Sequence, residues 1–169
     1  SPGMYNFDNV MDMGTESDAK AAKAVARTLH ANDNINIQFT SGTTGTPKGA
    51  TLSHRNILNN AFLSARSMRL TSVDRLCIPV PLYHCFGMVL GTLLCVSVGA
   101  TMVSPGEVFE PEQTLRTASE EKCTALHGVP TMFIALLDHP RRSEFDLATL
   151  RTGIMAGSTC PIEVMRRVI

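Results

Sequence analysis

An α/β fold with a largely parallel sheet flanked by helices is what the sequence predicts. Short apolar runs of strand length alternate with longer segments of helical character from residue 73 to the end of the chain, an order that is typical of βαβ units. Residues 76–106 contain no Asp, Glu, Lys or Arg, as expected where strands are buried on both faces. We therefore expect the main sheet in the second half of the chain.

The first 72 residues are predicted to form two parts. Residues 1–33 comprise an irregular lead-in to about residue 14 and an Ala-rich helix, and Thr15 to Asp18 resembles a weak capping motif at its start. Residues 34–72 carry a strand, a loop, a second short strand and an amphipathic helix. The strands are expected at Ile35–Phe39 and Ala50–Ser53, and the helix from Asn56 to about Met68.

Residues 73–169 are predicted to form a truncated series of βα repeats, which polar residues at 72–74 separate from the preceding helix. Strands are expected at 76–80, 101–103, 124–129 and 151–156, and helices at 86–98, 111–122, 130–137 and from 161 onward. A membrane-spanning helix is the alternative for the uncharged run, because about 20 apolar residues suffice to cross a bilayer. The prolines and glycines spread through that run favour a buried α/β core.

Charge and cysteine content narrow the class of protein. Lys plus Arg and Asp plus Glu both number 15, which argues against a nucleic-acid-binding surface. The five cysteines are odd in number and include no Cys-x-x-Cys pair, so their spacing suggests neither a disulfide framework nor a zinc site. Reduced, mostly buried thiols favour an intracellular compartment, and no metal-ligating residues are predicted.

The run from Phe39 to Gly49 is the strongest functional signal. It combines three glycines, five hydroxyl side chains and one lysine with no carboxylate. Glycines let backbone N–H groups approach a phosphate, hydroxyls donate hydrogen bonds, and Lys48 adds a positive charge. A flexible linker is the alternative, but a linker needs neither the fixed φ of Pro47 nor one isolated cation. We interpret the run as a nucleotide phosphate-binding loop.

The spacing of this loop excludes one large class of nucleotide-binding proteins. The P-loop NTPase motif has four residues between its first Gly and a Gly-Lys-Ser/Thr ending. Pro47 stands at that distance after Gly42, and Gly49 rather than a hydroxyl residue follows Lys48. Because the magnesium-binding hydroxyl is missing, the loop is not a Walker-type site.

The string from Thr40 to Gly49, with its continuation through Asn56, resembles the phosphate loop of the adenylate-forming superfamily. That superfamily contains acyl-CoA synthetases, beetle luciferases and peptide-synthetase adenylation domains. Residues 35–60 and 81–103 look most like medium-chain fatty acyl-CoA synthetases. The resemblance implies that the loop holds the β- and γ-phosphates of ATP. The nine residues so implied are Thr40, Ser41, Gly42, Thr43, Thr44, Gly45, Thr46, Pro47 and Lys48.

Pro81 to Gly87 is a second candidate segment. It follows a buried strand, where α/β proteins bind ligands, and holds His84 between Pro and Gly residues. A structural histidine that caps the next helix is the alternative. The segment resembles the family's Pro-Leu-aromatic-His-x-x-Gly motif. That resemblance implies a catalytic His84 beside the reacting carboxylate, with Phe86 and Gly87 at the wall of the acid pocket.

Gly153 to Pro161 is a third candidate segment. A strand that ends in small residues before a helix allows a ligand to approach the backbone closely. The segment resembles the family's Gly-Gly-Ala-Pro turn, which implies adenine contacts from Gly157, Ser158 and Thr159. Three residues depart from that turn, since Ser158, Thr159 and Cys160 stand for its second Gly, its Ala and its Pro. A simple helix cap by Ser158 or Thr159 is the alternative.

The remaining histidines are expected on the surface or in the core. They are His30, His54, His127 and His139. The segment of His127 resembles one that borders the acid pocket in the family.

The resemblance implies a ligase that activates a carboxylic acid, a fatty acid above all, with ATP. An acyl-adenylate forms with release of pyrophosphate, and the acyl group then passes to CoA. ATP, CoA and Mg²⁺ are the cofactors and co-substrates so implied, and the location would be mitochondrial or cytoplasmic. The alternatives are an adenylation domain or aryl-acid ligase of the same superfamily, or a non-catalytic nucleotide-binding fragment.

Several motifs of the family do not occur in these 169 residues. They are the aromatic-Gly-x-Thr-Glu turn that binds magnesium, a ribose-binding Asp and a C-terminal catalytic Lys. We therefore expect an internal fragment of the large N-terminal domain, with most Mg²⁺ ligands elsewhere and no ligase turnover by the fragment alone.

Overall fold

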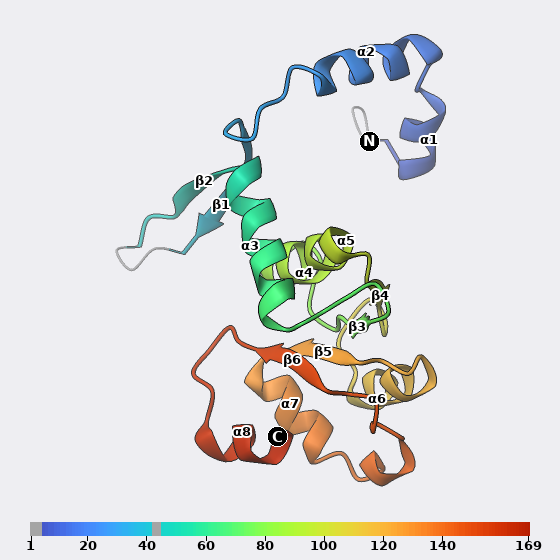
Figure 1. The fold of residues 1–169 in the computed structure, drawn as a ribbon, viewed down its shortest axis with the longest axis vertical. Helices are drawn as coiled ribbons and strands as arrows, with labels where there is room; N and C mark the ends of the chain where they lie inside the picture. The colour runs from blue at the N-terminus through green and yellow to red at the C-terminus, as the bar shows by residue number, and fades with distance from the viewer. Residues whose placement is uncertain (1–4, 42–44) are drawn as a thin grey trace. The chain divides into compact units, whose positions relative to one another are not determined.

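The computed structural model describes residues 5–41 and 45–169 (Figure 1). The chain forms two compact units, Ser1–Arg55 and Asn56–Ile169, and each is described by itself. The domain boundary expected near residue 73 stays a prediction.

The first unit begins with two helices. Helix α1 spans Phe7–Asp12, where the sequence predicted an irregular lead-in, and that prediction was wrong. Its six residues are too few to show a helical period, and the Asn6 side chain caps it by accepting from the Asn9 N–H. Helix α2 spans Glu16–Ala26 and opens with the expected capping box of Thr15 and Asp18.

Strands β1 (Asn34–Thr40) and β2 (Lys48–Ser53) follow as an antiparallel hairpin. Both strands were predicted, and each is longer by one or two residues at one or both ends. The register places Thr40 opposite Lys48, so the predicted phosphate loop is the connection of the hairpin. Antiparallel strands can be joined directly by such a connection, whereas parallel strands need a crossover.

The second unit contains a four-stranded parallel sheet in the order β4-β3-β5-β6. The strands are β3 (Arg75–Cys77), β4 (Thr101–Val103), β5 (Ala125–Gly128) and β6 (Thr152–Met155). The strand at 76–80 ends sooner than predicted, although the Ile78 N–H still donates to the Val103 carbonyl at 2.9 Å. Pro79 and Pro81 follow, and proline cannot donate to a sheet. The α/β class with a parallel sheet is confirmed.

Helices cover both faces of this sheet (Figure 1). Cys77, Val103 and Leu126 face one helical layer and belong to a single buried cluster with side chains of that layer. Strand residues with the opposite orientation face the other layer, where Ile78 approaches Gly91 and His127 contacts Phe86. The first layer comprises α6 (Pro111–Glu120), α7 (Pro130–Leu137) and α8 (Ile162–Val168), and the second comprises α3 (His54–Ser67), α4 (Cys85–Gly87) and α5 (Leu94–Val98). A short 3-10 turn, η2, spans Arg142–Glu144.

The helix predicted at 86–98 is interrupted. A π-helix, η1 (Met88–Leu93), separates α4 from α5. The described residues include no helix long and apolar enough to cross a bilayer. The uncharged run is divided among strands, loops and short helices. All five cysteines are free thiols, and Cys77, Cys95 and Cys123 are buried.

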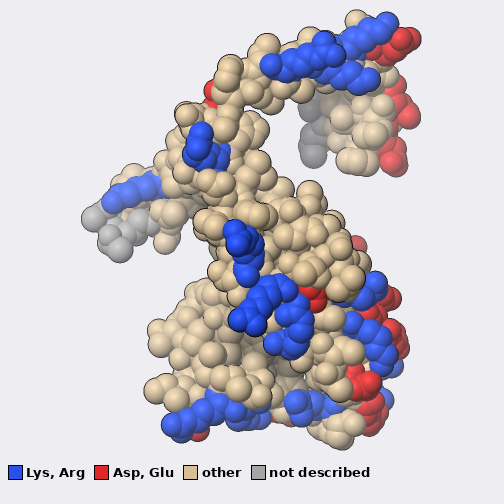
Figure 2. All heavy atoms as spheres, in the orientation of Figure 1, with Lys and Arg blue, Asp and Glu red and all other residues tan. Residues whose placement is uncertain are grey.

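Ion pairs link α6 and the turn after it to the segment at 141–146. Figure 2 shows acidic and basic side chains side by side over this part of the second unit. Glu112 of α6 pairs with both Arg116 and Arg141 at 2.7 Å, and Lys122 pairs with Asp146 at 3.1 Å. These side chains are partly or fully exposed, so each pair contributes little to stability.

Buried Asp74 lies at the amino-terminal edge of the parallel sheet, where the strands begin. Its Oδ1 accepts hydrogen bonds from Thr124 Oγ1 and Arg151 Nη2, both at 2.7 Å, and its Oδ2 accepts from the Thr71 N–H at 2.8 Å. Arg151 also donates to the Met68 and Arg69 carbonyls, which lie just beyond the end of α3. One carboxylate therefore ties the starts of three strands to the end of a helix.

Substitution of Asp74 by Asn is expected to cost about 2 kcal/mol of stability at neutral pH, because the buried network keeps its shape but loses its charge. Burial alone would raise the pKa of Asp74, but hydrogen bonds from Thr124, Arg151 and Thr71 and the charge of Arg151 bring it below its usual value. A lowered carboxyl pKa stabilises the fold above about pH 4 and loses this effect as pH falls through the folded value.

Thermal unfolding of the wild-type protein and Asp74→Asn at pH 7 and pH 3 checks this expectation. The difference between the two should be large at pH 7 and smaller at pH 3, because the stabilisation from a lowered carboxyl pKa is lost as pH falls below about 4 and through the folded pKa of Asp74. A difference of the same size at both pH values would contradict the assigned charge.

Candidate functional site

The predicted phosphate loop lies at the end of the β1–β2 hairpin. Gly42, Thr43 and Thr44 lie outside the described residues, and the other six predicted loop residues are exposed. Gly45 has φ +86° with open space where a Cβ would stand, so its backbone conformation, rather than crowding, favours glycine. Lys48 pairs with no carboxylate among the described residues. The described residues of the loop thus present to solvent hydroxyls, backbone groups and a charge that no described carboxylate compensates.

The other two predicted segments lie at one edge of the parallel sheet. The segment with His84 follows β3, and the turn at Gly157 follows β6. Between them runs β5, and the space at Gly157 is bounded by Val129 just beyond that strand, whose Cγ1 would lie 3.1 Å from an added Cβ. The carboxyl edge of a parallel sheet is where such folds bind ligands. The structure therefore brings these two segments to the same edge.

His84 caps helix α4, as the structural alternative predicted. Its Nδ1 accepts from the Phe86 N–H at 3.1 Å, so the neutral ring carries its proton on Nε2. The side chain is exposed, and Nε2–H remains a donor that suits a carboxylate or phosphate oxygen. The cap fixes the ring and does not compete with ligand binding. The Cys85 Sγ lies 3.8 Å from Nδ1, and because Nδ1 already accepts from a backbone N–H, the two residues do not form a catalytic dyad.

Phe86 and Gly87 lie beneath this loop and are buried. An added Cβ on Gly87 would stand 2.3 Å from the Pro81 carbonyl oxygen and 2.9 Å from the Leu82 Cα. Glycine is therefore required for the loop to rest on the helix. These two residues support the His84 loop from below, and their predicted place at the pocket wall stays a prediction.

The turn after β6 is exposed at Gly157, Ser158 and Thr159. Gly157 has φ +94°, a conformation that favours glycine. The cap of α8 is Pro161, which makes no side-chain cap hydrogen bond, so the alternative of a simple cap by Ser158 or Thr159 was wrong. Neither hydroxyl bonds to any residue in the described part of the chain, which leaves both free for a ligand.

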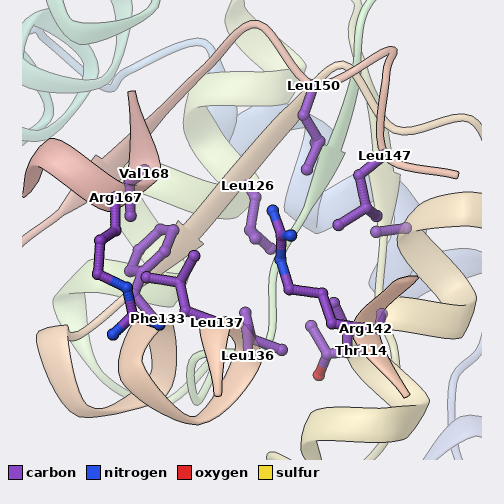
Figure 3. A pocket seen from close by; sticks show the side chains of 12 residues that line it. Thr114, Leu126, Phe133, Leu136, Leu137, Arg142, Leu147, Leu150, Arg167 and Val168 are labelled. Carbon is purple, nitrogen blue, oxygen red and sulfur yellow. The ribbon is translucent and has the colours of Figure 1, made fainter. Parts of the chain in front are cut away.

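An open groove of about 680 Å³ adjoins the His84 loop at the same edge of the sheet. It is lined by residues 78–83, Ser104, 106–109 and Met132. The segment after β4 was not predicted as part of any site, because residues 104–109 carry no motif. A smaller apolar hollow of about 90 Å³ lies on the face of the sheet that α6, α7 and α8 cover, among Leu126, Phe133 and Leu136 (Figure 3). Pockets for drug-sized ligands measure roughly 300 Å³ or more.

A metal centre is not built from the residues that the structure describes. Among residues 5–41 and 45–169, no three His, Cys, Asp or Glu side chains gather closely enough to hold an ion. The loop at 40–48 contributes no carboxylate either. These residues do not provide a site for Mg²⁺.

Known proteins resemble this chain over nearly its whole length. Residues 4–169 match the AMP-binding enzyme family. YngI of Bacillus subtilis, named as an acyl-CoA synthetase, is 56% identical over 168 residues. The mitochondrial medium-chain acyl-CoA ligase ACSF2 of Danio rerio is 44% identical over 170 residues. Each alignment covers 99% of this chain, but the chain spans only 30% and 28% of the two relatives.

Solved structures also resemble this chain. ATP-bound MatB from Rhodopseudomonas palustris superposes with a TM-score of 0.72 at 30% identity, covering 82% of this chain and 27% of that protein. The two proteins therefore share their fold over most of this chain. The chain belongs to the AMP-binding enzyme family.

Proposed function

We propose that the protein containing this chain is an ATP-dependent acid–CoA ligase that acts on medium-chain fatty acids. A carboxylate is a poor electrophile, and joining it to AMP supplies a good leaving group. The reaction would form an acyl-adenylate and pyrophosphate, and then a thioester with release of AMP. The observation that carries the proposal is the exposure of Thr40, Ser41 and residues 45–48, with a Lys48 that pairs with no carboxylate among the described residues, within a chain of the AMP-binding enzyme family.

The loop would bind the β- and γ-phosphates of ATP. Charge accumulates on pyrophosphate as it leaves, and fixed N–H groups, hydroxyls and the Lys48 ammonium stabilise that charge without reorganisation. The role of Lys48 is electrostatic, since no proton needs to be transferred at this position. The ATP-bound state of MatB supports the assignment of ATP.

The sheet edge of the second unit would bind the acid and the adenine. His84 Nε2–H donates to an oxygen of the acid, and the cap on Nδ1 keeps the ring in the tautomer with this donor. The backbone and free hydroxyls at 157–159 would contact adenine. The name of the ACSF2 relative supports medium-chain specificity and a mitochondrial location. Mg²⁺ would accompany ATP, bound by residues other than those described.

Product analysis of the full-length protein with ATP, Mg²⁺, CoA and a panel of acids tests the proposal. The panel should contain straight-chain acids of increasing length, aryl acids and amino acids. We expect AMP and a CoA thioester, with the highest kcat/KM for medium-chain acids. A preference for aryl or amino acids would move the protein to another branch of the superfamily, and ADP in place of AMP would refute adenylate formation.

A further inference from the structure

His127 is a fully buried side chain that joins two elements on either side of it. Its Nε2 lies 2.9 Å from the Leu90 carbonyl oxygen in the π-helix, and its Nδ1 lies 3.2 Å from the Ile154 N–H in β6. Nδ1 can accept from an N–H only when unprotonated, so Nε2 carries the proton and donates to Leu90. Burial lowers the pKa of His127, which keeps this neutral form. The ring is thus a bridge with one donor and one acceptor.

The bridge accounts for the π-helix that the sequence did not predict. In an α-helix the Leu94 N–H would donate to the Leu90 carbonyl, four residues earlier. Here the Leu94 N–H donates to the carbonyls of Val89 and Gly91 instead. This leaves the Leu90 carbonyl free of its α-helical donor, and the donor that it receives from outside the helix is His127. Side chains that insert into a helical hydrogen-bond ladder distort it in this way.

The two elements joined by His127 lead to the two candidate segments of the second unit. The π-helix directly continues α4, whose cap is His84, and Phe86 of α4 packs against the His127 ring with centroids 5.4 Å apart. Ile154 lies in β6, three residues before Gly157. His127 itself lies in β5, the strand between β3 and β6 in the sheet. A single side chain therefore contacts the elements that carry both segments.

We propose that His127 is a positioning residue of the ligase. Its bond to Leu90 holds the helix that presents His84 to the acid, and its bond to Ile154 holds the strand that presents the turn at 157–159 to adenine. The inference rests on the proposed function, and it assigns to one buried ring the relative placement of the acid and nucleotide sites.

Two substitutions separate the two hydrogen bonds. The polar atoms of Asn occupy the position of Nδ1, one bond beyond Cγ, and those of Gln reach the position of Nε2. His127→Asn therefore keeps an acceptor for Ile154 and loses the bond to Leu90, whereas His127→Gln keeps a donor for Leu90 and loses the bond to Ile154. Because the two variants are similar in size and polarity, each serves as the control for the other.

Steady-state kinetics of the full-length protein, with ATP and the best acid of the panel varied separately, give the first readout. We expect His127→Asn to raise the KM for the acid about tenfold with a smaller effect on ATP, and His127→Gln to raise the KM for ATP about tenfold with a smaller effect on the acid. Tenfold corresponds to the loss of one hydrogen bond. Equal effects of both variants on both substrates would reduce His127 to a general core residue and overturn the proposal, as would unchanged KM values.

Hydrogen exchange measured by mass spectrometry gives a readout that does not depend on activity. Peptides covering 152–157 should exchange faster in His127→Gln than in His127→Asn, and peptides covering 88–95 should show the reverse. Uniform loss of protection in both variants, or none, would overturn the bridge. If the wild-type protein makes no thioester, the proposed function fails, while the exchange pattern still decides whether His127 holds the two elements separately.

Discussion

Replacement of Gly87 by alanine is expected to destabilise the protein by about 3 kcal/mol and to abolish most acid activation. The added Cβ would stand 2.3 Å from the Pro81 oxygen and 2.8 Å from the Pro81 carbonyl carbon. Both atoms belong to the backbone and cannot rotate away, so the loop must lift from the helix. Overpacking of this kind costs about 1–3 kcal/mol and more where the backbone has to move. The lifted loop carries His84, which explains the expected loss of activity.

Two other glycines provide matched controls for this substitution. At Gly106 an added Cβ meets nothing closer than the Val108 carbonyl oxygen at 3.6 Å, which is an ordinary contact. At Gly91 it meets the Ile78 Cγ2 at 3.0 Å, and this side chain has some freedom to move. Thermal unfolding should rank the alanine variants in the order Gly106, Gly91 and Gly87, from least to most destabilised. A Gly87→Ala protein as stable as Gly106→Ala would contradict the described packing of the loop on α4.

Replacement of Lys48 by alanine is expected to lower the rate of ATP–pyrophosphate exchange by roughly 100-fold, with little change in the affinity for the acid. One charged group that stabilises a leaving anion contributes about this factor. Lys48 pairs in the hairpin register with Thr40 at the other end of the loop. The substitution leaves that backbone pairing in place. The effect should therefore appear in activity and not in thermal stability.

Lys20→Ala is the matched control for the charge change. Lys20 lies on α2, exposed, and pairs with Glu16 one turn earlier at 2.9 Å, so its loss should leave exchange unchanged. Lys48→Arg should recover part of the activity, because it restores the charge with a different hydrogen-bonding geometry. Wild-type exchange rates in Lys48→Ala would remove the loop from the mechanism.

The strands and most helices could be predicted because their signals are local. Period-two alternation marks Ile35 to Phe39, and the uncharged run marks the buried strands and helices at 76–103. Local signals do not reveal which strands pair, so the antiparallel hairpin that carries the loop became visible only in the structure. The π-helix was missed for the same reason, since the His127 ring that bonds to Leu90 within it lies 37 residues away along the chain.

The site was predicted in part. The positions of His84 and Gly157 at one sheet edge follow from their places after two strands of one parallel sheet. Asp74 was interpreted only as part of a polar boundary, because its partners Thr124 and Arg151 are 50 and 77 residues away. A carboxylate directly before a buried strand, where it must be compensated, was the signal that could have indicated its network.

Acid-dependent exchange of labelled pyrophosphate into ATP, measured with the full-length protein in the absence of CoA, tests the central claim most directly. Such exchange requires reversible formation of an acyl-adenylate before any thiol takes part. We expect label in ATP only when both the acid and Mg²⁺ are present, with the highest rate for medium-chain acids and a strong decrease in Lys48→Ala. No exchange in the presence of an acid that yields thioester with CoA would contradict the adenylate mechanism.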